Sequence, residues 1–388
     1  QRIETNKCRP RVMGYYKSRF ALGWIANVTL TVVFHWLLTE PLALLGLAEP
    51  AVVAGGVDIP WCHLSWAVAY LLMFVLNQLM IYPRENIEGA LFITGCDSGM
   101  GLEATLHFAK MGFRIYSGCY VLGSWEKICK LCKEKGVDEN LITVVPLDVT
   151  KSASIKDAAQ AVTRLIKEDK VEPGLVGLIN CAGIGITGPC EYLPMDMYKQ
   201  TFAVNYFGYV EVTQAFMPLL KASAATDGAR RSRVIFVGTG GGVMTPAPAL
   251  LSAYMGSKWA GEAFIQCFRM EMQLQKYRID ASMISPAFIK PTNIAEAGKV
   301  WIDRLWKSAP PQARDEYEEW LLRFQNYNAA QKGDPPIFVA EAMEEAMLAG
   351  RPEVGYKVGF ESQASPYAGS LPTFIREPLV RFAMFNDE

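Results

Sequence analysis

Two side chains in the second half of the chain could move a proton to or from an oxygen atom. Tyr254 and Lys258 are four residues apart in a predicted helix, so they lie on one face of it. A free tyrosine has a pKa of about 10, too high for a base near neutral pH. A neighbouring ammonium stabilises the phenolate and lowers that pKa. The pair therefore predicts acid–base chemistry at an alcohol or carbonyl oxygen.

A glycine-rich turn directly follows the apolar run Ala90–Thr94. Glycines at this spacing let the backbone approach a pyrophosphate at the N-terminus of a helix. The turn therefore predicts a dinucleotide site. Its predicted contacts are Gly95, Ser98, Gly99, Met100 and Gly101.

The chain that positions these residues alternates short apolar runs with helical patterns. The runs indicate buried strands at Leu91–Thr94, Arg114–Gly118, Ile142–Leu147, Gly177–Asn180, Val234–Val237 and Ala281–Ile284. The helical patterns between them cover Leu102–Met111, Ser154–Glu168, Tyr198–Ala222 and Leu251–Tyr277. This alternation predicts an α/β fold with a Rossmann-type doubly wound parallel sheet, covered by helices on both faces. We expect this catalytic domain to span residues 84–296, with a helical cap and an irregular tail in residues 297–388.

The glycine turn and the later Tyr-x-x-x-Lys motif together resemble the short-chain dehydrogenase/reductase family, over roughly residues 88–293. The resemblance implies that Tyr254 carries the proton, that Lys258 also holds the nicotinamide ribose, and that Asn205 anchors a water in a proton relay. It further implies that Asp148 faces the adenine ring. Other cofactor contacts implied by the family pattern are Cys119, Asn180, Ala182, Gly183, Pro286 and Thr292.

The chain departs from the family pattern at a few positions. Thr239 stands where the family has a serine that hydrogen-bonds the substrate oxygen, and it lies a little farther before Tyr254 than usual. Its hydroxyl can still donate and accept, although its methyl group fixes χ1. Cys181 replaces an asparagine and Ala287 a glycine, and Thr292 sits one residue late. Because of these departures a second class of function stays open, that of a membrane-tethered cofactor-binding scaffold with little turnover.

The residues that select NAD or NADP are expected at the end of the second strand. An acidic residue there binds the ribose 2′-hydroxyl of NAD, and an arginine binds the 2′-phosphate of NADP. Here that strand ends Ser117-Gly118-Cys119-Tyr120, with neither type of residue. Ser98 offers no cation in the glycine turn. The pattern therefore favours NAD, with NADP the weaker candidate.

The first 83 residues have the pattern of a membrane anchor. Residues 1–19 carry six basic side chains against one acid, and residues 20–39 carry no charge, which is about the span of a bilayer core. Residues 59–83 are also uncharged, and the stretch between has three acids and no base. This predicts a transmembrane helical hairpin within residues 20–83, with the basic tail and the catalytic domain facing the cytosol.

Two other arrangements stay open. One has a single membrane segment and a buried core helix, and the other has a short third span near Pro41–Val57, which would reverse the domain's side. We expect an endoplasmic reticulum membrane, with a mitochondrial membrane as the alternative.

Composition excludes other functions. The net charge of −1 implies no nucleic-acid partner. The three histidines are scattered, and Cys129 and Cys132 have no second pair to complete a zinc set, so we expect no metal. A homodimer is left open.

The strings Phe92–Gly99 and Tyr116–Cys119 resemble one branch of the family. It holds retinol dehydrogenases, 3-hydroxybutyrate dehydrogenase and the type 2 11β- and 17β-hydroxysteroid dehydrogenases. Combined with the anchor, the resemblance implies an oxidoreductase that transfers hydride between NAD(H) and a hydroxyl or keto group of a steroid or retinoid. A 3-hydroxybutyrate-type dehydrogenase is the alternative enzyme.

Overall fold

The computed structural model of the chain describes residues 50–53, 57–60, 84–121, 123–224, 231–240, 247–364 and 371–385. The chain divides into two compact units, residues 1–83 and residues 84–388. In the first unit, strands β1 (Pro50–Val53) and β2 (Val57–Pro60) pair in antiparallel orientation. The described end of the segment Pro41–Val57 is therefore extended and not helical.

Of the two uncharged segments of the predicted membrane hairpin, residues 20–39 and 61–83 lie outside the described residues, and Ile59 and Pro60 belong to β2. Among the residues that are described, no helix is both long and apolar enough to cross a bilayer. The hairpin therefore stays a prediction.

The second unit is built on a seven-stranded sheet with the order β5-β4-β3-β6-β7-β8-β9, in which every neighbouring pair is parallel. Because β3 lies between β4 and β6, the chain leaves it in one direction and later returns on its other side. A crevice is expected at the carboxyl ends of the strands at such a switch point. The strands are β3 (Ala90–Thr94), β4 (Arg114–Cys119), β5 (Ile142–Pro146), β6 (Leu175–Asn180), β7 (Ser232–Val237), β8 (Ile279–Pro286) and β9 (Gly355–Val358).

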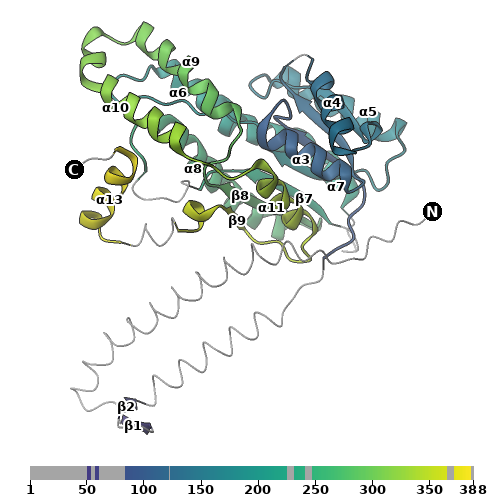
Figure 1. Cartoon of the computed structure of the whole chain (residues 1–388). Coiled ribbons are helices and arrows are strands. Elements are labelled where there is room, and N and C mark those ends of the chain that lie inside the picture. The colour runs from purple at the N-terminus through teal and green to yellow at the C-terminus, as the bar shows by residue number, and fades with distance from the viewer. Residues whose placement is uncertain are drawn as a thin grey trace. The chain divides into compact units, whose positions relative to one another are not determined.

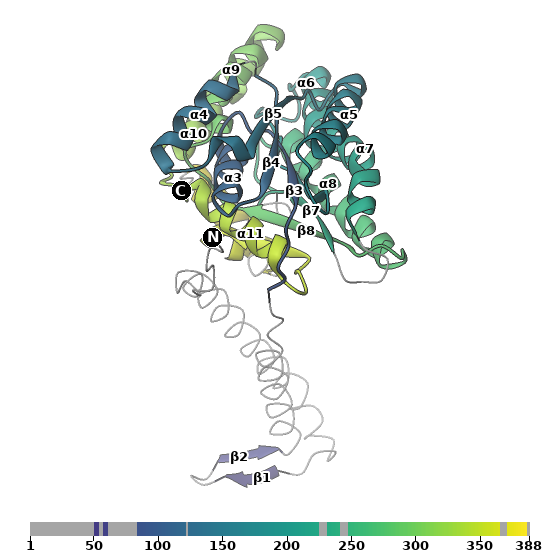
Figure 2. The same ribbon diagram turned by 90° about the vertical axis from the view of Figure 1, so that its right-hand side faces the viewer.

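Helices cover both faces of this sheet (Figure 2). On one face lie α3 (Gly99–Lys110), α4 (Ser124–Lys135) and α11 (Pro336–Leu348). On the other lie α5 (Ser152–Glu168), α7 (Gly208–Ser223) and α8 (Ser252–Gln273). Successive strand residues point to opposite faces, so Leu91 and Ile93 pack into the first layer while Ala90 and Phe92 pack into the second.

A third hydrophobic cluster lies beyond the carboxyl edge of the sheet and forms the cap (Figure 1). It joins α6 (Met195–Phe202), α9 (Asn293–Ser308) and α10 (Pro311–Ala330) to the start of α8. The remaining described elements are η1 (Glu139–Leu141), η2 (Ala203–Phe207) and α13 (Thr373–Phe385).

The predicted α/β fold and all six predicted strands are confirmed. Strand β9, a four-residue edge strand that contains Lys357 and pairs with β8, was not predicted from the sequence. Residues 297–388 were also expected outside the sheet, whereas α11 and β9 belong to the sheet and its covering layer. The expected irregular tail is wrong for residues 373–385, which form α13.

Candidate active site

A cavity of about 710 Å³ opens at the carboxyl edge of the sheet, bounded by β7, β8, the start of α8 and the cap helices α9 and α10. Three of the four predicted catalytic side chains line it: Thr239, Tyr254 and Lys258. Several predicted cofactor contacts also reach its wall: Met100, Gly183, Pro286 and Thr292. Residues far apart in the sequence thus meet in one place.

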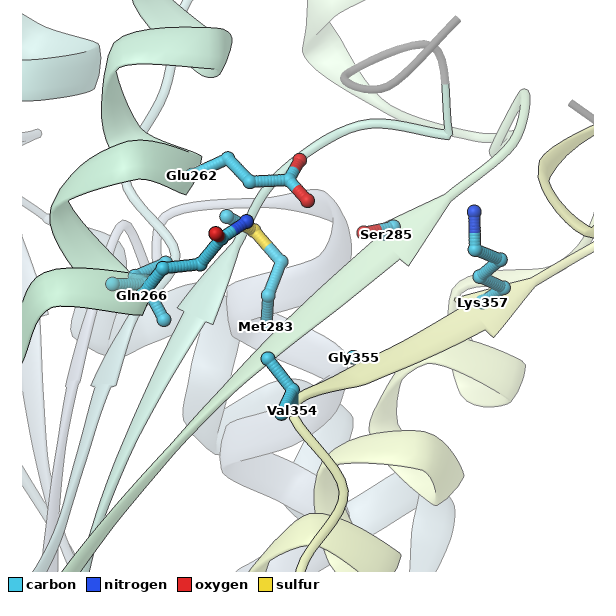
Figure 3. A pocket seen from close by; sticks show the side chains of 8 residues that line it. Glu262, Gln266, Met283, Ser285, Val354, Gly355 and Lys357 are labelled. Atoms are coloured by element: carbon cyan, nitrogen blue, oxygen red, sulfur yellow. The ribbon is translucent and has the colours of Figure 1, made fainter. Parts of the chain in front are cut away.

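A second, smaller hollow of about 50 Å³ lies between α8 and the strands β8 and β9 (Figure 3). Figure 3 shows Glu262 and Gln266 from α8 beside Ser285 from β8 and Lys357 from β9. Its lining includes none of the predicted site residues. Its volume suits a few water molecules, so it is not a candidate for the substrate site.

The glycine turn leaves no room for side chains at Gly95 and Gly101. Gly95 has φ of +72°, and a Cβ there would lie 2.7 Å from the Cα of Ala182. A Cβ at Gly101 would collide with the carbonyl oxygen of Gly95. The hydroxyl of Thr94 accepts hydrogen bonds from the backbone N–H groups of Cys181 and Ala182, both at 3.0 Å. The turn after β3 is therefore fixed to the end of β6, by the Thr94 hydroxyl and by the close approach of Gly95 to Ala182.

The N-terminus of α3 emerges from this turn. Its N-cap residue, Ser98, has extended backbone and makes no side-chain capping hydrogen bond. The first N–H groups of a helix have no partner within the helix, and together with the helix dipole they attract an anion. A Cβ added at Gly99 would lie 3.4 Å from Cγ2 of Thr292. The loop after β8 therefore borders the same turn. The arrangement fits a pyrophosphate.

Lys258 has its ammonium buried at the floor of the cavity, with 5% of the residue exposed. Its Nζ donates to Oη of Tyr209 at 2.9 Å and to the carbonyl oxygen of Val237 at 2.8 Å. Burial lowers the pKa of Lys258 to about 8, and the nearby Cys181 thiol opposes that effect. Two of the three ammonium protons are used, which leaves one for an acceptor in the cavity.

Tyr254 stands in the first turn of α8, where its hydroxyl shares a hydrogen bond with the side chain of Thr239. Burial raises the pKa of Tyr254, and the hydrogen bond with Thr239 only partly opposes this. The expectation that Lys258 lowers this pKa is wrong for this structure. The ammonium lies 6.0 Å from the centre of the Tyr254 ring and is engaged with Tyr209 and Val237 instead.

Asn205 is fully buried in η2, a short π-helical turn that interrupts the predicted helix Tyr198–Ala222. Its Oδ1 accepts from the N–H of Ile184 and its Nδ2 donates to the carbonyl of Ile184, both at 2.9 Å. Nδ2 also donates to Oγ of Ser257 at 3.0 Å. Asn205 therefore fixes the loop after β6 against α8 from behind the cavity wall.

Several predicted cofactor contacts lie away from the cavity wall, among them Asn180, Cys119 and Asp148. Asn180 is fully buried beneath it and donates to Oγ1 of Thr213 at 3.1 Å. Cys119 is also buried, at the end of β4. The carboxylate of Asp148 accepts from Thr150 and pairs with Lys151 at 3.0 Å. Burial alone would raise the pKa of Asp148, but these partners outweigh it and lower the pKa.

The sequence analysis missed Asp97, which lies inside the glycine turn. Its carboxylate accepts from the backbone N–H groups of Tyr120 at 3.0 Å and Val121 at 2.7 Å, and from Oγ of Ser124 at 2.7 Å. The Asp97 side chain therefore places a carboxylate at the end of β4, and the strand itself has no acidic residue there. The sequence does show an acidic residue within the glycine turn. Only the fold shows that the carboxylate of Asp97 reaches the end of β4.

Comparison with known proteins agrees with this geometry. Residues 90–301 match the family model described as short chain dehydrogenase. Mitochondrial D-beta-hydroxybutyrate dehydrogenase from Bos taurus is 30% identical over 285 residues, covering 69% of this chain and 76% of that protein. Estradiol 17-beta-dehydrogenase 2 from Mus musculus is 36% identical over 271 residues, covering 66% of this chain and 64% of that protein.

Solved structures share the fold. A short-chain dehydrogenase/reductase from Burkholderia phymatum in complex with NAD superposes with a TM-score of 0.54 at 21% sequence identity. The match covers 67% of this chain and 86% of that one. At this identity the likeness concerns the fold.

Adding a single methyl group to the glycine turn tests whether the cofactor binds there. Gly101→Ala should weaken NADH binding about 10- to 100-fold, because the new Cβ forces the turn away from Gly95 at an overpacking cost of about 1–3 kcal/mol. The measurement is an NADH fluorescence titration of the full chain in detergent micelles. Gly261→Ala on α8 is the matched control, since a Cβ there meets nothing within 4 Å. An unchanged dissociation constant for Gly101→Ala would mean that the cofactor does not use this turn.

Proposed function

The chain belongs to the short-chain dehydrogenase/reductase family and is an oxidoreductase acting on CH–OH groups, and we propose that its substrate is a lipophilic steroid or retinoid. The observation that carries the proposal is the cavity that brings Tyr254, Lys258 and Thr239 together. The wall beside them is mostly apolar: Val237, Pro248, Leu251, Met255, Ile302 and Phe324. Such a wall favours an apolar substrate over a short hydroxy acid.

We infer that Tyr254 and Thr239 handle the substrate oxygen. In reduction the phenol of Tyr254 gives its proton to the carbonyl oxygen and becomes a phenolate, and in oxidation the phenolate form takes the alcohol proton. Because burial raises its pKa, Tyr254 is a neutral phenol at neutral pH and is suited to donate. Thr239, which already hydrogen-bonds Tyr254, holds the substrate oxygen beside it.

The cofactor we propose is NAD(H), whose nicotinamide supplies hydride exchange with the carbon atom of the CH–OH group. The residues present fit it, because Gly95 and Gly101 have no room for a side chain and the α3 N-terminus has no side-chain cap. Lys258 has one ammonium proton left for a ribose hydroxyl. Asn205 supports Lys258 indirectly by fixing the loop at Gly183 and Ile184.

Asp97 gives a physical reason for preferring NAD over NADP. Its carboxylate lies between the glycine turn and the end of β4, the corner where an acid binds the ribose 2′-hydroxyl. A 2′-phosphate in that corner would meet a like charge. The ammonium of Lys127 donates to the backbone carbonyl of Asp97 at 3.0 Å.

Residues 20–83 are proposed to anchor the enzyme in the endoplasmic reticulum membrane with the catalytic domain in the cytosol. A mitochondrial membrane remains the alternative. The uncharged segments and the basic tail support the anchor. A lipophilic substrate dissolves in the bilayer, so an anchored enzyme can take its substrate directly from the membrane.

Changing Asp97→Asn should raise the ratio of kcat/KM for NADP to that for NAD about tenfold, because the like charge is removed. Asparagine still offers an oxygen to the backbone of β4, so kcat/KM for NAD should stay within a few-fold. The exposed acid Glu126→Gln on α4 is the control for a general charge effect. A ratio unchanged by Asp97→Asn would remove Asp97 from cofactor choice.

Protease added to sealed microsomes that carry the full chain should digest the catalytic domain, because an even number of crossings returns it to the cytosolic side. Immunoblotting of residues 84–388 with and without detergent gives the readout. Protection of the domain until detergent is added would contradict a hairpin anchor.

The proposed reaction is tested by screening steroids, retinoids and short hydroxy acids for NAD reduction by the full chain in micelles. At least one lipophilic alcohol should be oxidised, and Tyr254→Phe should lower kcat at least about 100-fold while NADH binding is retained. Tyr277→Phe, just beyond the other end of α8, is the matched control. Activity on hydroxy acids alone would instead favour the hydroxybutyrate alternative, and an active Tyr254→Phe would refute the assigned role.

A further inference from the structure

Helix α10 contributes a row of amide side chains to the cavity wall. Gln325, Asn328 and Gln331 line the cavity and are three residues apart, so they share one face of the helix and its C-terminal cap. All three are partly buried. Within the described part of the chain, none of their side-chain amides has a hydrogen-bond partner, although each carries two donors and an acceptor.

This polar row continues along α10 from the apolar part of the cavity wall. Phe324, directly before the row, packs in the cap cluster with Leu250 and Ala253, the residues that lead into Tyr254. From Phe324 to Gln331 an α-helix rises about 10 Å. The cavity wall is thus apolar at Phe324 and polar along the face of α10 that follows it.

The end of α10 is held in place by a part-buried contact with the loop after β8. Lys290, in the loop after β8, donates from Nζ to the backbone carbonyls of Asn328, Ala329 and Gln331 at 3.0, 3.0 and 2.7 Å. These carbonyls end the helix, where a cation is favourable. All three protons of the Lys290 ammonium are used, so it is not available to a negatively charged ligand.

Apart from Lys258, which belongs to the catalytic group, the remaining charges of the cavity wall are balanced. Lys299 and Glu361 also line the cavity and have opposite signs. Tyr327 stays a neutral phenol, because burial and the charge of Glu361 both raise its pKa. Amides and a neutral phenol suit an uncharged hydroxyl or keto group.

We propose that Gln325, Asn328 and Gln331 form a subsite for a second, uncharged oxygen function of the substrate. The substrate is then a long apolar molecule with a hydroxyl or keto group remote from the carbon that reacts. This inference rests on the proposed function and narrows it. A steroid with two oxygen functions fits, whereas retinol has one oxygen and hydroxybutyrate is short and anionic.

The test compares a steroid diol with the mono-alcohol that lacks the remote hydroxyl. Equilibrium dialysis of the full chain in micelles with NADH gives each dissociation constant, and NAD reduction gives turnover. Asn328→Leu removes the amide at similar size and leaves the backbone carbonyl that binds Lys290. Asn326→Leu, the same change at an exposed position of α10, is the matched control, and Gln331→Met is a second cavity variant.

Asn328→Leu and Gln331→Met should each weaken diol binding about tenfold, for the loss of a hydrogen bond, and change mono-alcohol binding less than twofold. Asn326→Leu should change neither. Equal effects on the two alcohols would overturn the subsite, even if both are oxidised and the proposed function stands. The expected binding pattern without any oxidation would support the subsite and refute the proposed reaction.

Discussion

The structure of the site depends on the burial of one positive charge, the ammonium of Lys258. An ammonium out of water is costly, and here it is offset by the Tyr209 hydroxyl from α7 and the Val237 carbonyl at the end of β7. The loop after β6 must also come close, since a Cβ at Gly183 would lie 3.4 Å from Nζ. Two strands and two helices therefore have to meet around this charge. Its pKa of about 8 reflects a balance that a further acceptor would complete.

The glycine turn is the second fixed point, and the sheet order links it to the first. Because β3 and β6 are neighbours, the turn after β3 and the loop after β6 meet at the same edge, with Thr94 holding the two together. Gly95 approaches Ala182 closely at this edge. The N-terminus of α3, which has no side-chain cap, lies beside the cavity that holds Lys258. The cap then closes the cavity on the side away from the sheet, through α9 and α10.

Much of this was predictable because it follows from local patterns. Continuous apolar runs gave the six strands, and the Gly95–Gly101 spacing gave the turn. The missed features depend on distant partners. Strand β9 exists because β8 offers an edge, and Asp97 matters because its carboxylate reaches the end of β4. The pKa of Tyr254 was misjudged because helix spacing does not show that Lys258 is engaged by Tyr209.

Side-chain direction was the other limit. The family pattern places Asn180 among the cofactor contacts, yet its amide is buried against Thr213 on α7. Likewise, nothing in the sequence indicates that Lys290 ends α10 from the loop after β8. The predicted site residues keep their assigned roles as proposals, and the cavity supplies the reason to hold them together.

The central claim is that this cavity passes hydride directly between a lipophilic alcohol and NAD. The most direct measurement is the fate of deuterium from an alcohol labelled at its CH–OH carbon, followed by NMR of the NADH that the full chain forms. We predict one deuterium at carbon 4 of the nicotinamide, on a single face, from every alcohol molecule oxidised. NADH without deuterium, or label on both faces, would contradict hydride transfer in this site.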